Sequence, residues 1–301
     1  MEKDITQKTL EDYNDVFADV LNVLLFEGKR LVTPQQLVDS RTKSQYKADD
    51  SRIHEQERDN SKYWKKEHMV ITLFGIENQI AAEKNMPIRI IGYDGASYRS
   101  QLIDKTQRGM YPVVSVILYF GMTPWNYSKN LVDVFDIPED VKPYVSDYKI
   151  NVFEIAYLTS EQVNMFESDF REVADFFVQK RTTNDYVPSR RKLKHVDEVL
   201  KLLKVMTGDN RFEEVYIPDE RKKDATMCEI VDKFINKGIS QGISQGIKLG
   251  DSTGDSRRLI KSVETLSLHS GVSIEKACEM IGSTLKEYST AKNILKSSKN
   301  Q

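Results

Sequence analysis

An α/β fold, with helices beside a sheet and a helical C-terminal part, is predicted by three stretches in the first half of the chain. Two continuous apolar runs, at residues 71–76 and 113–120, are typical of strands covered on both faces. Between them, a stripe of apolar residues at helical steps over residues 87–104 consists of Ile88, Ile91, Tyr98 and Leu102, and Pro87 suits the first turn of a helix. Such a strand–helix–strand unit is most economically a right-handed parallel crossover.

A first helix is predicted over residues 9–27, with Gly28 as its stop. Its apolar face consists of Leu10, Tyr13, Phe17, Val20, Leu21 and Leu24. Another face carries Asp12, Asp15 and Asp19. Two interpretations are open for these acids. They form a solvated face, or Asp15 or Asp19 reaches a metal site as an outer carboxylate.

The segment before the first apolar run is mostly polar. Residues 31–33 are extended ahead of Pro34, and residues 40–56 are charged and lack clean periodicity. We expect a helix start there, followed by a loop that delivers Asp59. Residues 57–66 then mix one further acid, several bases and two aromatic residues.

After the second apolar run the chain changes from strands to helices. Residues 122–148 contain three prolines, which predicts a structured loop, and residues 149–157 form a further strand. Thr159 and Gln162 have the spacing of a helix capping box. The apolar face of the helix that follows is Val163, Phe166, Phe170, Val173 and Phe177. Another helix is predicted over residues 190–207, ended by Gly208.

The strongest local concentration of positive charge lies between these two helices. Six bases accompany a single acid, Asp185. The bases are Lys180, Arg181, Arg190, Arg191, Lys192 and Lys194. They are either a solvated charge run or a surface that contacts phosphates.

The C-terminal third contains a four-residue repeat in which glycine and isoleucine recur together. The glycines are Gly238, Gly242, Gly246 and Gly250, and the isoleucines are Ile235, Ile239, Ile243 and Ile247. Small residues at this spacing allow close helix approach, although glycine weakens a helix by roughly 1 kcal/mol per site. We expect a linker helix that pairs with a second copy, giving a homo-oligomer. The predicted domains are residues 1–207, a linker at 208–254 and a small helical tail at 255–301.

Composition indicates a globular protein outside the membrane. Hydrophobic residues make up 39% and charged residues 30%, and no apolar run approaches 18 residues. The first residues lack the basic and apolar regions of a signal peptide, and the two cysteines have no metal or redox spacing. We therefore expect a cytoplasmic protein. The net charge of −2 excludes a broadly basic coat for nucleic acid but leaves room for a local basic channel.

The residues that end the first strand indicate metal chemistry. Glu77 and Gln79 are two apart, so on a strand they point to the same side. With Asp59 they would supply what metal-dependent phosphodiester hydrolysis needs. Asp59 and Glu77 offer carboxylates for Mg²⁺, or Mn²⁺ in its place, and the backbone carbonyl of Asn78 completes the shell. Gln79 can hold a water but cannot act as a base.

The chain resembles the Rpn group of recombination-promoting nucleases, which are transposase-like members of the PD-(D/E)XK superfamily. The stretches that carry the resemblance are Arg58 and Asp59, Lys62 and Tyr63, residues 75–79, residues 86–89, Tyr93 and Asp94, Tyr98 and Arg99, residues 111–121 and Trp125. The resemblance covers roughly residues 12–180 and the glycine repeat. It implies a restriction-endonuclease-like mixed sheet flanked by helices, and Mg²⁺-dependent DNA cleavage.

Within that resemblance, individual positions acquire expected roles. Asp59 and Glu77 match the metal carboxylates, and Asp15 or Asp19 matches an acid of the first helix. Gln79 stands where the superfamily usually has Lys. The interval from Asp59 to Glu77 is also long for a pair of this kind.

The leading hypothesis is a Mg²⁺-dependent DNA endonuclease acting in recombination or transposition. In it Asp59, Glu77 and Gln79 are catalytic, while Lys62, Arg190, Arg191 and Lys192 contact DNA phosphates. The alternative is a non-catalytic DNA- or protein-binding module on a degenerate nuclease fold, which the neutral Gln79 favours. A third is an assembly protein organised by the glycine repeat.

Overall fold

A computed structural model describes residues 9–40, 43–47, 53–103, 109–215, 217–222 and 224–297. The chain forms two compact units, Met1–Val231 and Asp232–Gln301. The boundary between them falls inside a long helix, α8. The division expected from the sequence, after residues 207 and 254, stays a prediction.

The first unit is built on a five-stranded mixed sheet, which confirms the α/β class. Its order is β1 (Leu37–Asp39), β4 (Asn60–Lys66), β5 (Met69–Gln79), β6 (Val113–Tyr119) and β7 (Asn151–Glu154). The pairs β1–β4 and β4–β5 are antiparallel, and the pairs β5–β6 and β6–β7 are parallel. The strand expected at residues 71–76 is therefore the central strand, and it extends to Gln79.

Helix α2 (Met86–Ile103) connects the parallel strands β5 and β6, as the strand–helix–strand pattern predicts. Its buried face differs from the predicted stripe, however. Met86, Ile90 and Tyr93 pack in the core with Ile117 and Tyr119 of β6. The residues that were expected to pack against the sheet are instead exposed: Ile88, Ile91, Tyr98 and Leu102.

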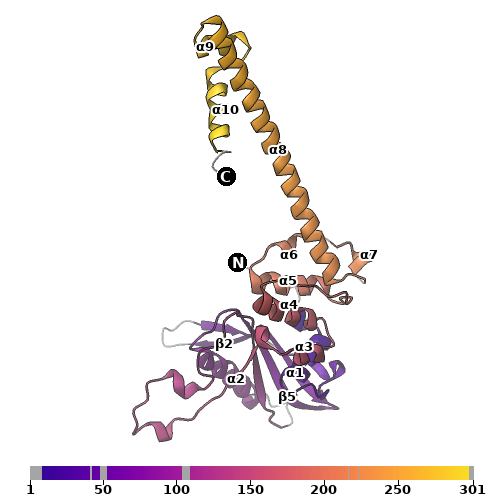
Figure 1. Ribbon diagram of the computed structural model, residues 1–301. Helices are drawn as coiled ribbons and strands as arrows, with labels where there is room; N and C mark the ends of the chain where they lie inside the picture. Colours follow the sequence, from indigo (N-terminus) through magenta and orange to yellow (C-terminus); the bar gives the residue numbers. More distant parts are fainter. Residues whose placement is uncertain are drawn as a thin grey trace. The chain divides into compact units, whose positions relative to one another are not determined.

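The opposite face of the sheet is covered by the first helical segment and by helices from later in the chain (Figure 1). The 3-10 turn η1 (Leu10–Asp12) is followed by α1 (Asn14–Leu24). Phe26, just after α1, packs edge-on against Phe74 of β5. Phe120, just after β6, contacts Phe170 and Phe177 of α4 (Phe170–Thr183).

A two-stranded sheet precedes β4, where a helix start and a loop were predicted. Strands β2 (Lys43–Lys47) and β3 (Ile53–Glu57) pair antiparallel. The prediction for residues 40–56 was therefore wrong in its described part. Propensity failed here because the segment is polar and has no apolar period of either kind.

The helices after the sheet follow the predicted apolar faces. Helix α3 (Ser160–Met165) begins at the predicted capping box, in which Thr159 Oγ1 accepts from the Gln162 N–H at 3.2 Å. Helix α5 (Val196–Thr207) begins later than predicted, because the preceding segment is held extended by a bridge between Lys192 and Thr226. Short helices α6 (Arg211–Glu214) and α7 (Asp219–Lys222) complete this region.

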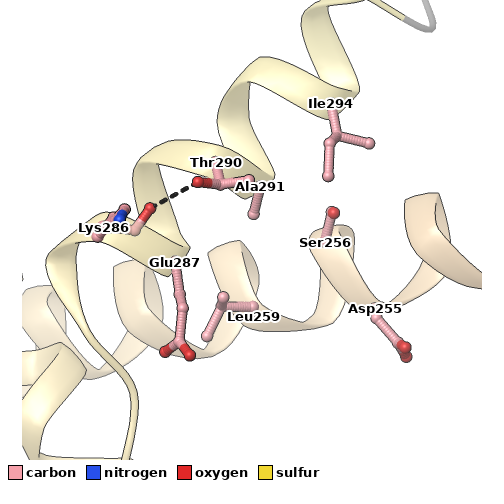
Figure 2. Close-up of a pocket in the computed structure, with 8 residues that line it drawn as sticks. All are labelled: Asp255, Ser256, Leu259, Lys286, Glu287, Thr290, Ala291 and Ile294. Carbon is pink, nitrogen blue, oxygen red and sulfur yellow. Dashed lines mark hydrogen bonds between the residues drawn. The ribbon is translucent and has the colours of Figure 1, made fainter.

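The C-terminal unit is helical. Helix α8 (Met227–Ser270) runs unbroken through the glycine repeat and is followed by α9 (Ile274–Met280) and α10 (Leu285–Ser297). A small core joins them, made by Val263, Ala277, Cys278 and Tyr288. Between α8 and α10 lies an open pocket of about 380 Å³, where Leu259 faces Ala291 and Ser256 faces Ile294 (Figure 2). None of the residues predicted for the metal site lines it.

Within the described residues, no helix is both long enough and apolar enough to span a membrane.

Candidate functional site

The hairpin of β4 and β5 brings Asp59 beside Glu77. Asn60 pairs with Ile76 across the hairpin, so Asp59 comes directly before β4, at the level where β5 reaches Glu77. Asp59 Oδ2 accepts a hydrogen bond from the backbone N–H of Asn78 at 2.8 Å. The long interval between Asp59 and Glu77 in the sequence is therefore explained by the β4–β5 hairpin, whose two strands lie between them.

Glu77 is a buried carboxyl with one oxygen engaged and the other without a partner. Only 1% of the residue is exposed. Its Oε2 lies 3.2 Å from Arg89 Nη2 of α2, and its Oε1 has no hydrogen-bond partner. Burial, and next the negative charge of Asp59, raise the pKa of Glu77 to about 8, against the opposing effect of Arg89.

Glu11 is a third acid at this site, and no pattern in the sequence predicts it there. It lies in η1 and is 1% exposed. Its Oε1 accepts from Asn78 Nδ2 at 3.2 Å, while its Oε2 has no hydrogen-bond partner. Burial raises the pKa of Glu11 to about 7, and the charge of Asp59 adds to the effect. Glu11 and Glu77 thus approach the end of β5 from the two sides of the sheet, with Asp59 near both.

Asp15, one of the two first-helix acids proposed for the site, is engaged elsewhere. Its Oδ2 lies 2.6 Å from Lys194 Nζ, and its Oδ1 lies 3.2 Å from His195 Nε2. The cation at Lys194 holds the pKa of Asp15 below its ordinary value, although partial burial opposes this shift.

Asp19, the other proposed acid, stabilises the fold through hydrogen bonds and an ion pair. Its Oδ2 accepts from the backbone N–H groups of Glu167 and Ser168 at 2.8 and 2.7 Å, and it forms an ion pair with Arg30. The described contacts of Asp15 and Asp19 are with other parts of the fold, and the expectation that one of them joins the site stays a prediction. The acid of this part of the chain that contacts the end of β5 is Glu11.

We expect Asp19→Ala to lower the free energy of unfolding by about 2–4 kcal/mol, because it leaves two partly buried N–H groups and the Arg30 charge without their acceptor. Urea unfolding would measure this. Glu167→Ala is the matched control, since the exposed Glu167 contacts the same Arg30 at 3.1 Å and should cost less than about 1 kcal/mol. Equal losses in both variants would contradict the assignment of Asp19 to the fold.

Gln79 ends β5 on the same face as Glu77, as the strand period predicts. It pairs with Tyr119 of β6, and its backbone carbonyl accepts from the Phe120 N–H at 2.8 Å. Its side chain is half-buried. Its role in holding a water stays a prediction.

Lys62 does not lie where a phosphate could reach it. It is 1% exposed, its ammonium donates to the Asp12 carbonyl at 2.9 Å, and it forms an ion pair with Asp39 of β1. Burial and these two partners favour a structural role for Lys62, and its contact with DNA stays a prediction.

The residues expected to form a phosphate-binding patch lie on the extended segment before α5. Arg190 is exposed and Arg191 is half-buried. Lys192 is exposed but forms an ion pair with Asp224, so part of the charge of this segment is neutralised. Contact of these three residues with DNA stays a prediction.

The oxygen atoms at the end of β5 fit a hard divalent cation. Three buried oxygens there have no hydrogen-bond partner among the described residues: Glu11 Oε2, Glu77 Oε1 and Asn78 Oδ1. Leaving such atoms unpaired is costly, and Mg²⁺ or Mn²⁺ is bound by oxygen ligands of this kind. In the part of the chain that the structure describes, no three His, Cys, Asp or Glu residues form a ready-made ligand cluster. Amide oxygens and retained waters would therefore complete the shell, as Mg²⁺ commonly allows.

Residues 65–206 match the family model described as "Putative transposase, YhgA-like". This part of the chain is similar to the YhgA-like family. The match confirms the resemblance to the Rpn group of transposase-like proteins. It includes Glu77, Gln79 and Arg89, whereas Glu11 and Asp59 precede it. No curated protein and no solved structure matches the chain.

Proposed function

We propose that the chain is a Mg²⁺-dependent DNA endonuclease that hydrolyses phosphodiester bonds in recombination or transposition. The family match supports a transposition-related activity and DNA as the partner. The observation that carries the finer proposal is that Glu11 and Glu77 each have a buried carboxyl oxygen without a partner at the end of β5, where Asp59 bonds to the Asn78 N–H.

In this proposal Glu11, Asp59, Glu77 and Asn78 hold the metal through oxygen atoms. The bound metal would supply a water of lowered pKa and neutralise charge on the phosphate. The protein positions these ligands through its hairpin, because the Asp59 carboxylate is fixed by the Asn78 N–H at 2.8 Å. Gln79, on the face of Glu77, orients the attacking water by hydrogen bonds and takes no proton from it.

Burial favours neutral acids at this site until a cation arrives. The pKa values of about 7 for Glu11 and about 8 for Glu77 mean that burial keeps both carboxyls largely protonated in the absence of metal at mildly acidic pH. Metal binding would release these protons. We therefore expect Mg²⁺-dependent activity to rise between about pH 6 and 8.

A plasmid-nicking assay tests the proposal. We expect wild type to nick supercoiled plasmid with Mg²⁺ and not with EDTA, and Glu77→Ala to lower the rate about 100-fold or more, because it removes a ligand of the charged site. Glu139→Ala is the control, since Glu139 is a carboxylate with a largely exposed side chain in a loop. Equal nicking by wild type and Glu77→Ala would refute the site.

The second candidate is a non-catalytic module that binds DNA or a protein on the same fold. The neutral Gln79 favours it, because β5 carries no cation beside Glu77. Calorimetric titration with Mg²⁺ separates the two. Binding that disappears in Glu77→Ala supports the nuclease, and no binding above background supports the module.

A further inference from the structure

We propose that Arg89 is a catalytic residue of this site and that its guanidinium contacts the phosphate that is cleaved. The proposal rests on the proposed function. It begins from a charge imbalance at the end of β5. Glu11, Asp59 and Glu77 all carry acid groups, while the residue of β5 that follows on the Glu77 face, Gln79, is neutral. A phosphate diester brought into this site needs a nearby cation from another element.

Helix α2 supplies that cation. Arg89 Nη2 lies 3.2 Å from Glu77 Oε2, and Arg89 Nε donates to the Tyr93 hydroxyl at 3.0 Å. The guanidinium carbon also lies 5.8 Å from the centroid of the Tyr93 ring. Two separate contacts therefore fix the orientation of the guanidinium plane next to the acid that ends β5.

One side of this guanidinium stays available. Arg89 Nη1 makes an ion pair with the half-exposed Glu83 Oε2 at 3.9 Å, which is too long for a hydrogen bond and leaves the N–H groups of Nη1 able to donate. The Arg89 side chain is 36% exposed, so solvent reaches it while Glu77 itself is buried. An arginine has five N–H donors in a planar fork that matches two oxygens of a phosphate. The contacts with Glu77 and Tyr93 leave donors free to meet such a group.

Arg58, the other arginine near Glu77, is too deeply buried to contact a phosphate. Arg58 is 5% exposed and forms a buried ion pair with Asp94, which also accepts from Ser115 Oγ at 2.7 Å. Its Nη1 lies so close to Gly75 that a Cβ there would come within 2.2 Å of it. Arg58 is therefore held inside the fold beneath the strand, whereas Arg89 lies at its rim.

The chemistry assigned to Arg89 is electrostatic. Attack by water forms one P–O bond and breaks one P–O ester bond, leaving a phosphate monoester end and a hydroxyl end. The proton of the water passes to solvent, and the leaving oxygen takes a proton from solvent. Negative charge on the non-bridging oxygens increases during attack, and a fixed guanidinium stabilises it. Arg89 stays protonated throughout and acts neither as acid nor as base.

A simpler role for Arg89 would be to balance the charge of Glu77. The two roles differ in how they respond to metal. If Arg89 only balances Glu77, its loss should be compensated once Mg²⁺ saturates the site, because the metal then supplies the positive charge. If Arg89 contacts the phosphate, the loss should persist at saturating Mg²⁺.

The test compares Arg89→Gln, Arg89→Lys and Arg99→Gln, with Arg99 as an exposed arginine of the same helix. Nicking is measured at rising Mg²⁺, and affinity for a short DNA duplex is measured with Ca²⁺ in place of Mg²⁺. We expect Arg89→Gln to lower kcat about 100-fold at saturating Mg²⁺ and to weaken duplex binding several-fold. Arg89→Lys should recover part of both losses, and Arg99→Gln should stay within about threefold of wild type.

Two outcomes overturn the inference. One is a return of Arg89→Gln to the wild-type rate at saturating Mg²⁺, and the other is duplex affinity equal to that of Arg99→Gln. Failure of the proposed function gives a different pattern, in which wild type nicks no faster than Glu77→Ala. The affinity comparison still decides the phosphate contact of Arg89 in that case, because it needs no cleavage.

Discussion

Replacing Glu11 by Gln is expected to lower Mg²⁺-dependent nicking about 100-fold or more, as much as loss of Glu77. The change keeps the size of the side chain and its hydrogen-bonding ability while removing the charge. Glu11 Oε2 is buried and has no hydrogen-bond partner, so no contact within the described fold accounts for this carboxyl oxygen. Asn78, whose Nδ2 donates to the other oxygen of Glu11, lies next to Glu77.

Asp15→Asn is the matched control for this experiment. Asp15 belongs to the same helical segment and was the sequence-based candidate, but it pairs with Lys194 and His195. We expect Asp15→Asn to keep nicking within about threefold of wild type. The reverse result, with Asp15→Asn inactive and Glu11→Gln active, would restore the first-helix acid that the sequence indicated. Circular dichroism and the thermal midpoint of each variant would establish that both are folded.

The reason Glu11 escaped sequence analysis is a break in the backbone. A single helix over residues 9–27 would place Glu11, Asp15 and Asp19 on one face at four-residue steps. The structure instead has a 3-10 turn at Leu10–Asp12, after which Tyr13 is extended with φ −79° and ψ 126°. Because of this break, Glu11 turns towards β5 while Asp15 and Asp19 turn towards later segments. Apolar periodicity continues across the break and gives no sign of it.

The central strands were predictable because their chemistry is simple. The apolar runs of β5 and β6 are buried on both faces, and their parallel pairing followed from the helix between them. Strand β4 was not predicted, because it mixes Lys62 and Lys65 with aromatic residues. Its burial depends on partners from elsewhere, such as Asp39 for Lys62. Long-range pairing of a charged side chain leaves no local signal in the sequence.

The proximity of Asp59 and Glu77 could be predicted from the sequence only in part. Both acids were singled out from the end of the apolar run and from the family resemblance. Their proximity required the β4–β5 hairpin, which brings residues far apart in the sequence to one level of the sheet. Tertiary structure thus supplied the geometry that the residue types alone left open.

The metal-free protein should become less stable as pH rises, and Mg²⁺ should remove this dependence. The pKa of Glu11 is raised to about 7 and that of Glu77 to about 8, first of all by burial. In the unfolded chain both groups lose their protons near pH 4.5. Between about pH 4.5 and 8 the unfolded state therefore binds fewer protons than the folded state. The free energy of unfolding then falls as pH increases and levels off above about pH 8.

The size of the effect should be on the order of 3 kcal/mol between pH 5.5 and 8.5, because two buried groups contribute but interact with each other. For a unit of this length that corresponds to a fall in Tm of about 6–12 °C. Thermal unfolding in EDTA at pH 5.5, 7.0 and 8.5 would measure it. The double variant Glu11→Gln, Glu77→Gln should lose most of the slope, since neither side chain then titrates.

Addition of Mg²⁺ at pH 8.5 connects this slope to the site. A cation that binds the ionised carboxylates stabilises the folded state by an amount that grows with its concentration relative to its Kd. Wild type should therefore regain most of the lost Tm, and the double variant should respond little, because its amides offer no charge. A slope in wild type that Mg²⁺ leaves unchanged would mean that the buried acids at the end of β5 do not bind the metal. Their raised pKa values would then reflect burial alone.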